Sequence, residues 1–100
     1  MNAPADKTSA LIAALWQKNK PIVEERLSVL EKFSITSSNQ QREEVISAAH
    51  KLSGSLGMYG YPIASEIAAK IEHLLKHEPS TEITGLVSAI RQNLGMITGS

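Results

Sequence analysis

Hydrophobic residues recur along this chain every three or four positions, the spacing that places side chains on one face of an α-helix. Helices are predicted at about residues 8–18, 21–33, 39–58, 62–76 and from Ser80 or Thr81 to about residue 98. No segment alternates with a period of two, so strands are not expected. The predicted fold is all-α, an antiparallel four-helix bundle with an additional short N-terminal helix across one end.

The first two predicted helices are separated by Asn19, Lys20 and Pro21. Proline has no backbone N–H to donate and disfavours the helical conformation in the residue before it, so Pro21 interrupts a helix. Proline also fits the first turn of a new helix. Residues 8–33 are therefore either two helices or one kinked helix.

The boundaries of the third and fourth helices carry clear signals. Ser38 followed by Gln41 is a capping box that begins the third helix, and Gly60 suits the left-handed residue that ends it. Pro62 then enters the first turn of the fourth helix. Such a tight turn makes the two helices an antiparallel pair. The expected buried stripe of the fourth helix is Ile63, Ile67, Ile71, Leu74 and Leu75.

A histidine lies on the outer face of the third helix. At about 100° per residue, the apolar stripe of this helix lies roughly 140° away from His50, which therefore points outward. The stripe consists of Val45, Ala49, Leu52, Leu56 and Tyr59. The residues predicted to surround His50 are small except for Ile46 and Lys51, and comprise Ile46, Ser47, Lys51, Ser53, Gly54 and Gly57.

Two glycines one turn apart on an exposed helical face need an explanation, because each costs about 1 kcal/mol relative to alanine. Without side chains, Gly54 and Gly57 let another surface approach the imidazole closely. An exposed imidazole, with an unperturbed pKa of roughly 6.5, is substantially neutral and nucleophilic near pH 7. It can take a phosphoryl group on a ring nitrogen and release it again.

The run AHKLSGSLGMYG, which contains His50, followed by Ile67, Ala68, Ile71 and Glu72, resembles the signature of the histidine-containing phosphotransfer (HPt) domains of bacterial two-component phosphorelays. In that family an apolar residue follows the histidine after two positions, a glycine after four and another after ten. His50, Leu52, Gly54 and Gly60 match. The resemblance covers about residues 39–76 directly.

The chain departs from many family members at Ser53, where they carry a lysine beside the phosphoryl group. Lys51 does not replace it simply, since residues one position apart do not face each other on a helix. Ser53 either donates one hydrogen bond to a phosphoryl oxygen or is merely small.

The resemblance implies a phosphocarrier rather than an enzyme. His50 would accept a phosphoryl group from the aspartyl phosphate of a response-regulator receiver domain and pass it to another receiver. The receiver would supply the magnesium ion, so the domain itself needs no cofactor. The alternative is a helical docking module for a receiver or a hybrid histidine kinase that carries no phosphate.

Composition narrows the class of protein. The chain has 100 residues, of which 42% are hydrophobic, so one domain is expected over residues 8–98 after a flexible N-terminus at residues 1–7. Ten basic and ten acidic residues give zero formal net charge, which does not favour nucleic acid as a partner. Short apolar runs and the absence of cysteine indicate a cytoplasmic monomer without membrane insertion.

The two other histidines have the spacing of metal ligands. His73 and His77 lie four residues apart on the fourth predicted helix, with Glu72 and Glu78 nearby. A metal site would need a third ligand and an ordered outer shell. We therefore interpret the pair as a solvated helix face and predict no metal site.

Overall fold

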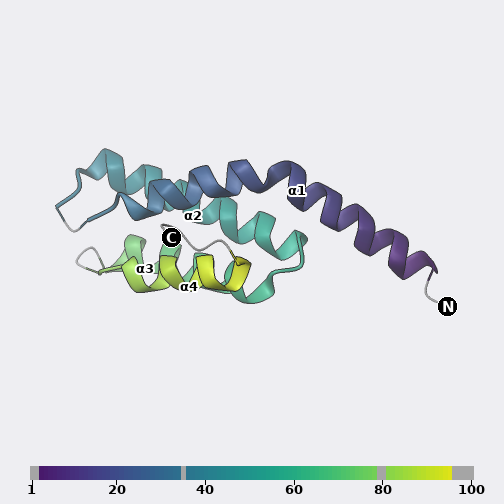
Figure 1. Ribbon diagram of the computed structural model, residues 1–100. Helices are drawn as coiled ribbons and strands as arrows, with labels where there is room; N and C mark the ends of the chain where they lie inside the picture. The colour runs from purple at the N-terminus through teal and green to yellow at the C-terminus, as the bar shows by residue number, and fades with distance from the viewer. Residues whose placement is uncertain (1–2, 35, 79–80, 96–100) are drawn as a thin grey trace.

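The protein is a bundle of antiparallel helices. The computed structural model describes residues 3–34, 36–78 and 81–95. Four helices run through these residues: α1 (Ala3–Glu31), α2 (Asn39–Met58), α3 (Pro62–His77) and α4 (Thr84–Leu94). Contacts between α1 and α2, α2 and α3, α3 and α4, and α4 and α1 close the bundle (Figure 1). The all-α prediction is confirmed.

The additional short N-terminal helix was a wrong prediction, because α1 is a single helix that passes through Pro21. The other possibility, one continuous helix, is the one adopted. A proline inside a helix costs about 3 kcal/mol, whereas each large apolar side chain that is buried contributes about 1.5–3 kcal/mol. Trp16 on one side of Pro21 and Val23 and Leu27 on the other are all buried. Packing on both sides therefore offsets the lost hydrogen bond.

The first part of α1 extends past the other three helices (Figure 1). The helix begins at Ala3, earlier than the expected Thr8. Trp16 anchors this part, because its ring lies 5.7 Å from that of Tyr59 and 5.1 Å from that of Tyr61, measured between centroids. These aromatic residues thus join α1 to the turn between α2 and α3.

The turn between α2 and α3 forms as its sequence indicates. Ser38 accepts a hydrogen bond from the Gln41 backbone N–H at 3.1 Å, and the Gln41 side chain accepts one from Ser38 N–H at 2.8 Å, which completes the capping box. At the other end Gly60 has φ 91°, a value that favours glycine. The N–H of Tyr61 bonds to the Leu56 carbonyl at 2.9 Å, and that of Gly60 bonds to the Gly57 carbonyl, a Schellman motif.

The core is made largely by the predicted stripes, of which Tyr59, Ile67 and Leu74 are half-buried and not buried. Val45, Ala49, Leu52 and Leu56 of α2 are all buried, as expected. On α3, Ile63 is 59% exposed, so its predicted burial is wrong. It lies in the first turn of α3, and its neighbour Ala64 takes the core position. The small side chain of Ala64 lets α2 and α3 approach closely.

The ends of α4 differ from the prediction. The helix begins at Thr84 without a side-chain cap, so Thr81 does not cap it, and Ser80 lies outside the described residues. It ends at Leu94 because Gly95 adopts a left-handed conformation with φ 71°. Residues 96–98, over which the helix was expected to continue, lie outside the described residues.

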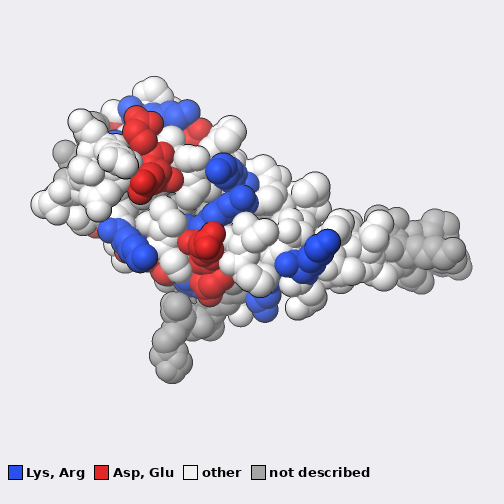
Figure 2. Space-filling view, turned by 90° about the horizontal axis from the view of Figure 1, so that it is seen from above, with Lys and Arg blue, Asp and Glu red and all other residues white. Residues whose placement is uncertain are grey.

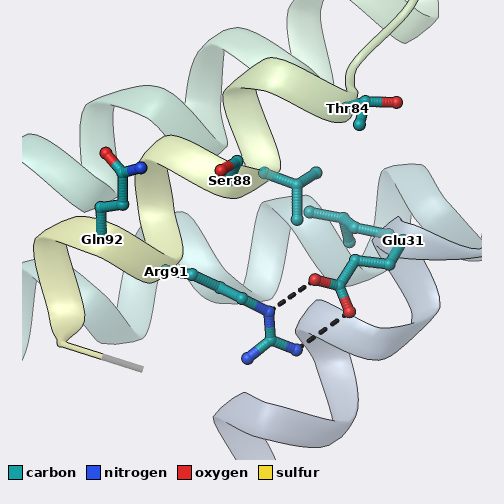
Figure 3. A pocket seen from close by; sticks show the side chains of 7 residues that line it. Glu31, Thr84, Ser88, Arg91 and Gln92 are labelled. Carbon is teal, nitrogen blue, oxygen red and sulfur yellow. Dashed lines mark hydrogen bonds and ion pairs between the residues drawn. The ribbon is translucent and has the colours of Figure 1, made fainter. Parts of the chain in front are cut away.

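A buried arginine links α4 to α1. Arg91 is only 4% exposed, and its Nε and Nη2 donate to the carboxylate of Glu31 at 2.5 and 3.0 Å (Figure 3). Its Nη1 and Nη2 donate to Glu24 at 3.1 and 2.5 Å. Burial of a guanidinium requires such pairing. Arg91 also lines a pocket of about 300 Å³ between α1 and α4, but its nitrogens are directed to these carboxylates.

The surface carries charges of both signs. Lysine, arginine and glutamate side chains are interspersed over the face seen in Figure 2. This distribution agrees with zero formal net charge and offers no extended basic stripe on that face. None of the described helices is both long enough and apolar enough to span a bilayer.

Candidate functional site

His50 lies on the outer surface of α2, as predicted. Its side chain is 72% exposed, whereas its neighbour Ala49 and Leu52 two positions later are fully buried. Because the apolar stripe faces the core, the imidazole has to point away from it. The ring is therefore accessible to another molecule at a rigid position inside a helix.

One acidic side chain contacts the imidazole. Nδ1 of His50 lies 3.2 Å from Oε1 and 3.1 Å from Oε2 of Glu72, which comes from α3. Glu72 is 16% exposed, so packing against the helix pair restrains it. Lys76, one turn further along α3, donates to Oε2 of Glu72 at 2.9 Å. His50, Glu72 and Lys76 thus form a chain of hydrogen bonds across the α2–α3 surface.

The hydrogen bonds of Glu72 also affect the ionisation of its carboxyl group. The hydrogen bond from Lys76, and then that from His50, hold the pKa of the Glu72 carboxyl below its ordinary value, against the opposing effect of burial. Glu72 is therefore a carboxylate near neutral pH.

An ionised carboxylate can only accept hydrogen bonds. Nδ1 of His50 must therefore be the donor, and in the neutral ring the lone pair lies on Nε2. All hydrogen bonds of the imidazole to described residues run through Nδ1. Nε2, the nucleophilic nitrogen of the neutral ring, therefore has no hydrogen bond to a described residue.

The contact between His50 and Glu72 was not predicted, although Glu72 was part of the motif. A signal for it exists in the sequence. The two residues are equally far from Tyr61, at the centre of the turn between α2 and α3. In an antiparallel helix pair joined by a tight turn, residues equally distant from the turn lie at the same height.

The two glycines near His50 have different surroundings. A Cβ atom added at Gly54 would meet no atom of the described residues within 4 Å, so none of their atoms requires glycine there. A Cβ atom at Gly57 would lie 3.4 Å from Oγ of Ser65 on α3. A Cβ at Gly57 would thus make an ordinary contact with α3, while Gly54 leaves open space one turn from the imidazole.

Ser53 uses its hydroxyl within the helix. Its Oγ donates to the His50 carbonyl at 2.9 Å, and its own carbonyl accepts a hydrogen bond from Ser65 Oγ at 2.5 Å. A hydroxyl has one hydrogen, and here the backbone takes it. In this arrangement Ser53 acts as a small residue and not as a donor toward an incoming group.

The remaining residues predicted near His50 lie on its other side. Ser47 and Lys51 line a groove of about 620 Å³ between α1 and α2, together with Ile22 and Val29. Ile46 is half-buried and packs against the core. The structure thus brings Glu72 and Lys76 to the imidazole from α3, and directs Ser47 and Lys51 toward α1.

The two other histidines, His73 and His77, lie on α3. The rings of His73 and His77 have centroids 4.5 Å apart and are tilted by 44°. Over the described parts of the chain, no three histidine, cysteine, aspartate or glutamate side chains gather in a way that could hold a metal ion. The pair has no third protein ligand within those parts.

Comparison with known proteins adds one finding. A family model described as Hpt domain matches residues 11–97, which includes α2, α3 and α4 in full and most of α1. Neither a search of curated proteins nor a search of solved structures finds a match.

Proposed function

This chain belongs to the Hpt domain family, whose members are phosphotransfer intermediates of phosphorelays and interact with receiver domains, and we propose that His50 is its phosphorylated residue. In this proposal the imidazole takes a phosphoryl group from the aspartyl phosphate of one receiver domain and passes it to the aspartate of another. The observation that carries the proposal is the exposed ring whose Nδ1 is held by Glu72.

The transfer step follows from that geometry. The Nε2 lone pair attacks phosphorus, an N–P bond forms, and the P–O bond to the receiver's aspartate breaks with its electron pair on the leaving carboxylate. The proton stays on Nδ1, so the phosphorylated ring carries a positive charge, which the carboxylate of Glu72 stabilises. The reverse sequence delivers the group to a second receiver.

The partner supplies most of the catalysis in this proposal. Phosphoryl transfer depends on positioning and on neutralising the oxygens of the moving group. We expect the magnesium ion on the receiver domain, and this chain contributes the nucleophile, its orientation and a surface for docking. The domain itself needs no cofactor.

The docking surface is proposed to surround His50. Gly54 provides the opening through which the aspartyl phosphate reaches Nε2, since its surroundings within the protein are empty. Ile46 contributes apolar contact at the edge of the core, and Ser47 and Lys51 extend the surface toward α1. Ser53 and Gly57 add no large side chain to this face, so a partner can approach the ring.

The test is transfer of label from a phosphorylated receiver domain to the purified protein. We expect a product that is labile in acid and stable in alkali, as phosphohistidine is. His50→Gln should take up no label, and His73→Gln, which alters another exposed histidine, should be labelled like the wild type. A wild-type protein that binds the receivers but takes no label would refute the proposal and support the docking module without phosphate.

A further inference from the structure

We infer that Lys76 is a positioning residue for the reaction of His50, because it offsets the charge of the carboxylate that orients the ring. This inference rests on the proposed function and adds to it a residue on the neighbouring helix. Nothing in the sequence pattern around His50 indicates it.

The geometry places Lys76 close to the imidazole. Nζ of Lys76 and Nδ1 of His50 contact the same oxygen, Oε2 of Glu72, at 2.9 and 3.1 Å. Because they share that atom, the ammonium nitrogen and the ring nitrogen are at most 6.0 Å apart. Glu72 precedes Lys76 by four residues on α3, the favourable order for such a pair on a helix.

The site needs this cation because Glu72 has two opposite effects. The carboxylate keeps the ring proton on Nδ1 and so leaves Nε2 free to react. The same negative charge favours the imidazolium form, which has no lone pair on Nε2, and it repels the incoming phosphoryl oxygens. Lys76 cancels that charge while the hydrogen bond to Nδ1 remains.

Ser53, three residues after His50, bears on why the site needs a cation from another helix. Many family members carry a lysine there, and this chain has Ser53, whose hydroxyl is bonded to the backbone. No cation from α2 therefore occupies the position beside the phosphoryl group. Lys76 instead brings a positive charge to the Nδ1 side of the ring from α3, through its contact with Glu72.

Other charged groups face α2 from the opposite side. Glu25 and Arg26 of α1 line the groove between α1 and α2 with Glu43, Glu44 and Lys51 of α2. On α3 the charged groups in hydrogen-bond contact with this site are Glu72 and Lys76. Variants at these two residues leave the groove unchanged, so their effects can be assigned to the α3 pair.

The first measurement is an NMR titration of the His50 ring in the free protein. We expect Lys76→Gln to move the midpoint of this titration upward, because it removes a positive charge that lies at most 6.0 Å from Nδ1. Glu72→Gln should move it downward, and Glu72→Gln with Lys76→Gln should bring it back toward the wild type.

The second measurement separates charge from orientation. Ring ¹⁵N shifts report which nitrogen carries the proton. Lys76→Gln should retain the proton on Nδ1 in the neutral ring, because Glu72 is still present. Both variants that contain Glu72→Gln should lose this preference, since an amide can donate as well as accept. The double variant should therefore accept phosphate more slowly than the wild type, although the midpoint of its titration lies close to that of the wild type.

Matched variants complete the experiment. Lys76→Arg keeps the charge and should titrate like the wild type, whereas Lys70→Gln removes a lysine from α3 that is two positions from Glu72 and faces elsewhere. Lys76 is half exposed, so its replacement should not unfold the bundle, which circular dichroism checks. Lys70→Gln should shift the titration less than Lys76→Gln.

The kinetic consequence is measured with a phosphorylated receiver. On the acidic side of the titration, acceptance by Lys76→Gln should be slower than that of the wild type because fewer rings are neutral, and the difference should narrow at higher pH. An unchanged titration in Lys76→Gln, or Lys76→Arg behaving like Lys76→Gln, would overturn the inference. If the titrations behave as stated but the wild type takes no label, the proposed function fails instead.

Discussion

Arg91 allows a sharp prediction about stability, because the two sides of its ion-pair cluster differ in exposure. The guanidinium is 4% exposed, while the side chains of Glu24 and Glu31 are 45% and 36% exposed. The hydrogen bonds from Glu31 and then Glu24 raise the pKa of Arg91 above its ordinary value. The arginine therefore depends on the glutamates more than they depend on it.

Two opposite perturbations test this asymmetry. Glu24→Gln combined with Glu31→Gln leaves a buried cation without a counter-charge, which typically costs 3–5 kcal/mol for a fully buried pair. Because the glutamates are partly hydrated, we expect about 3 kcal/mol here. Arg91→Met removes the buried charge, fills its volume with an apolar side chain and leaves two carboxylates that can rehydrate, so we expect about 1 kcal/mol or less.

The assay is thermal unfolding followed by circular dichroism at pH 7. For a domain of this size, 1 kcal/mol corresponds to a change in Tm of about 4–8 °C. The double glutamine variant should therefore melt about 12–24 °C lower than the wild type, and Arg91→Met should melt well above the double variant. Equal losses for the two proteins, or a larger loss for Arg91→Met, would refute the argument from exposure.

Three further predictions follow from the described contacts. The hydrogen bond from Arg91 holds the pKa of Glu24 below its ordinary value of about 4.5, so its stabilisation is present above that pH and lost as the pH falls through the folded value; acid unfolding of Glu24→Gln should be less steep below pH 4.5 than that of the wild type, and equal slopes would contradict the assignment. Gly54→Leu should raise Tm, because glycine costs about 1 kcal/mol in a helix and the site is empty, yet it should slow transfer from a receiver; an unchanged transfer rate would count against the opening at Gly54. Ser53→Lys should lengthen the half-life of the phosphorylated protein if a cation on α2 stabilises it, and an unaltered half-life would show that charge from that position is not needed.

Local signals predicted the pair of helices that carries the site. The Ser38 capping box, Gly60 and Pro62 each act over a few residues, so the beginning and end of α2 could be recognised without tertiary structure. The outward direction of His50 follows from the same helical period that buries Leu52. Those predictions needed only the geometry of one helix.

The errors arose where distant contacts decide. Pro21 interrupts a helix unless both flanks are packed. The packing of Trp16 against Tyr59 and Tyr61 involves residues more than 40 positions later in the sequence, so it could not be recognised from the residues around Pro21. The apolar period also gave no sign of Arg91, which is buried because Glu24 and Glu31 meet it from α1.

Within the site, the partners of His50 that the sequence did not reveal belong to another helix. Along α2 the neighbours of His50 in sequence are Lys51 and Ser53. Glu72 and Lys76 reach it only because α3 lies beside α2. Helical periodicity describes one helix at a time, and finding these partners requires the register between two helices as well.

The three residues between Met58 and Pro62 set that register. If one extra residue before Pro62 moved α3 along its axis while its apolar face stayed toward the core, Glu72 would leave the level of His50 and lose its contact with the ring. The length of this connection therefore belongs to the chemistry as much as any side chain does. An insertion there should leave a folded protein whose imidazole has lost its orienting partner.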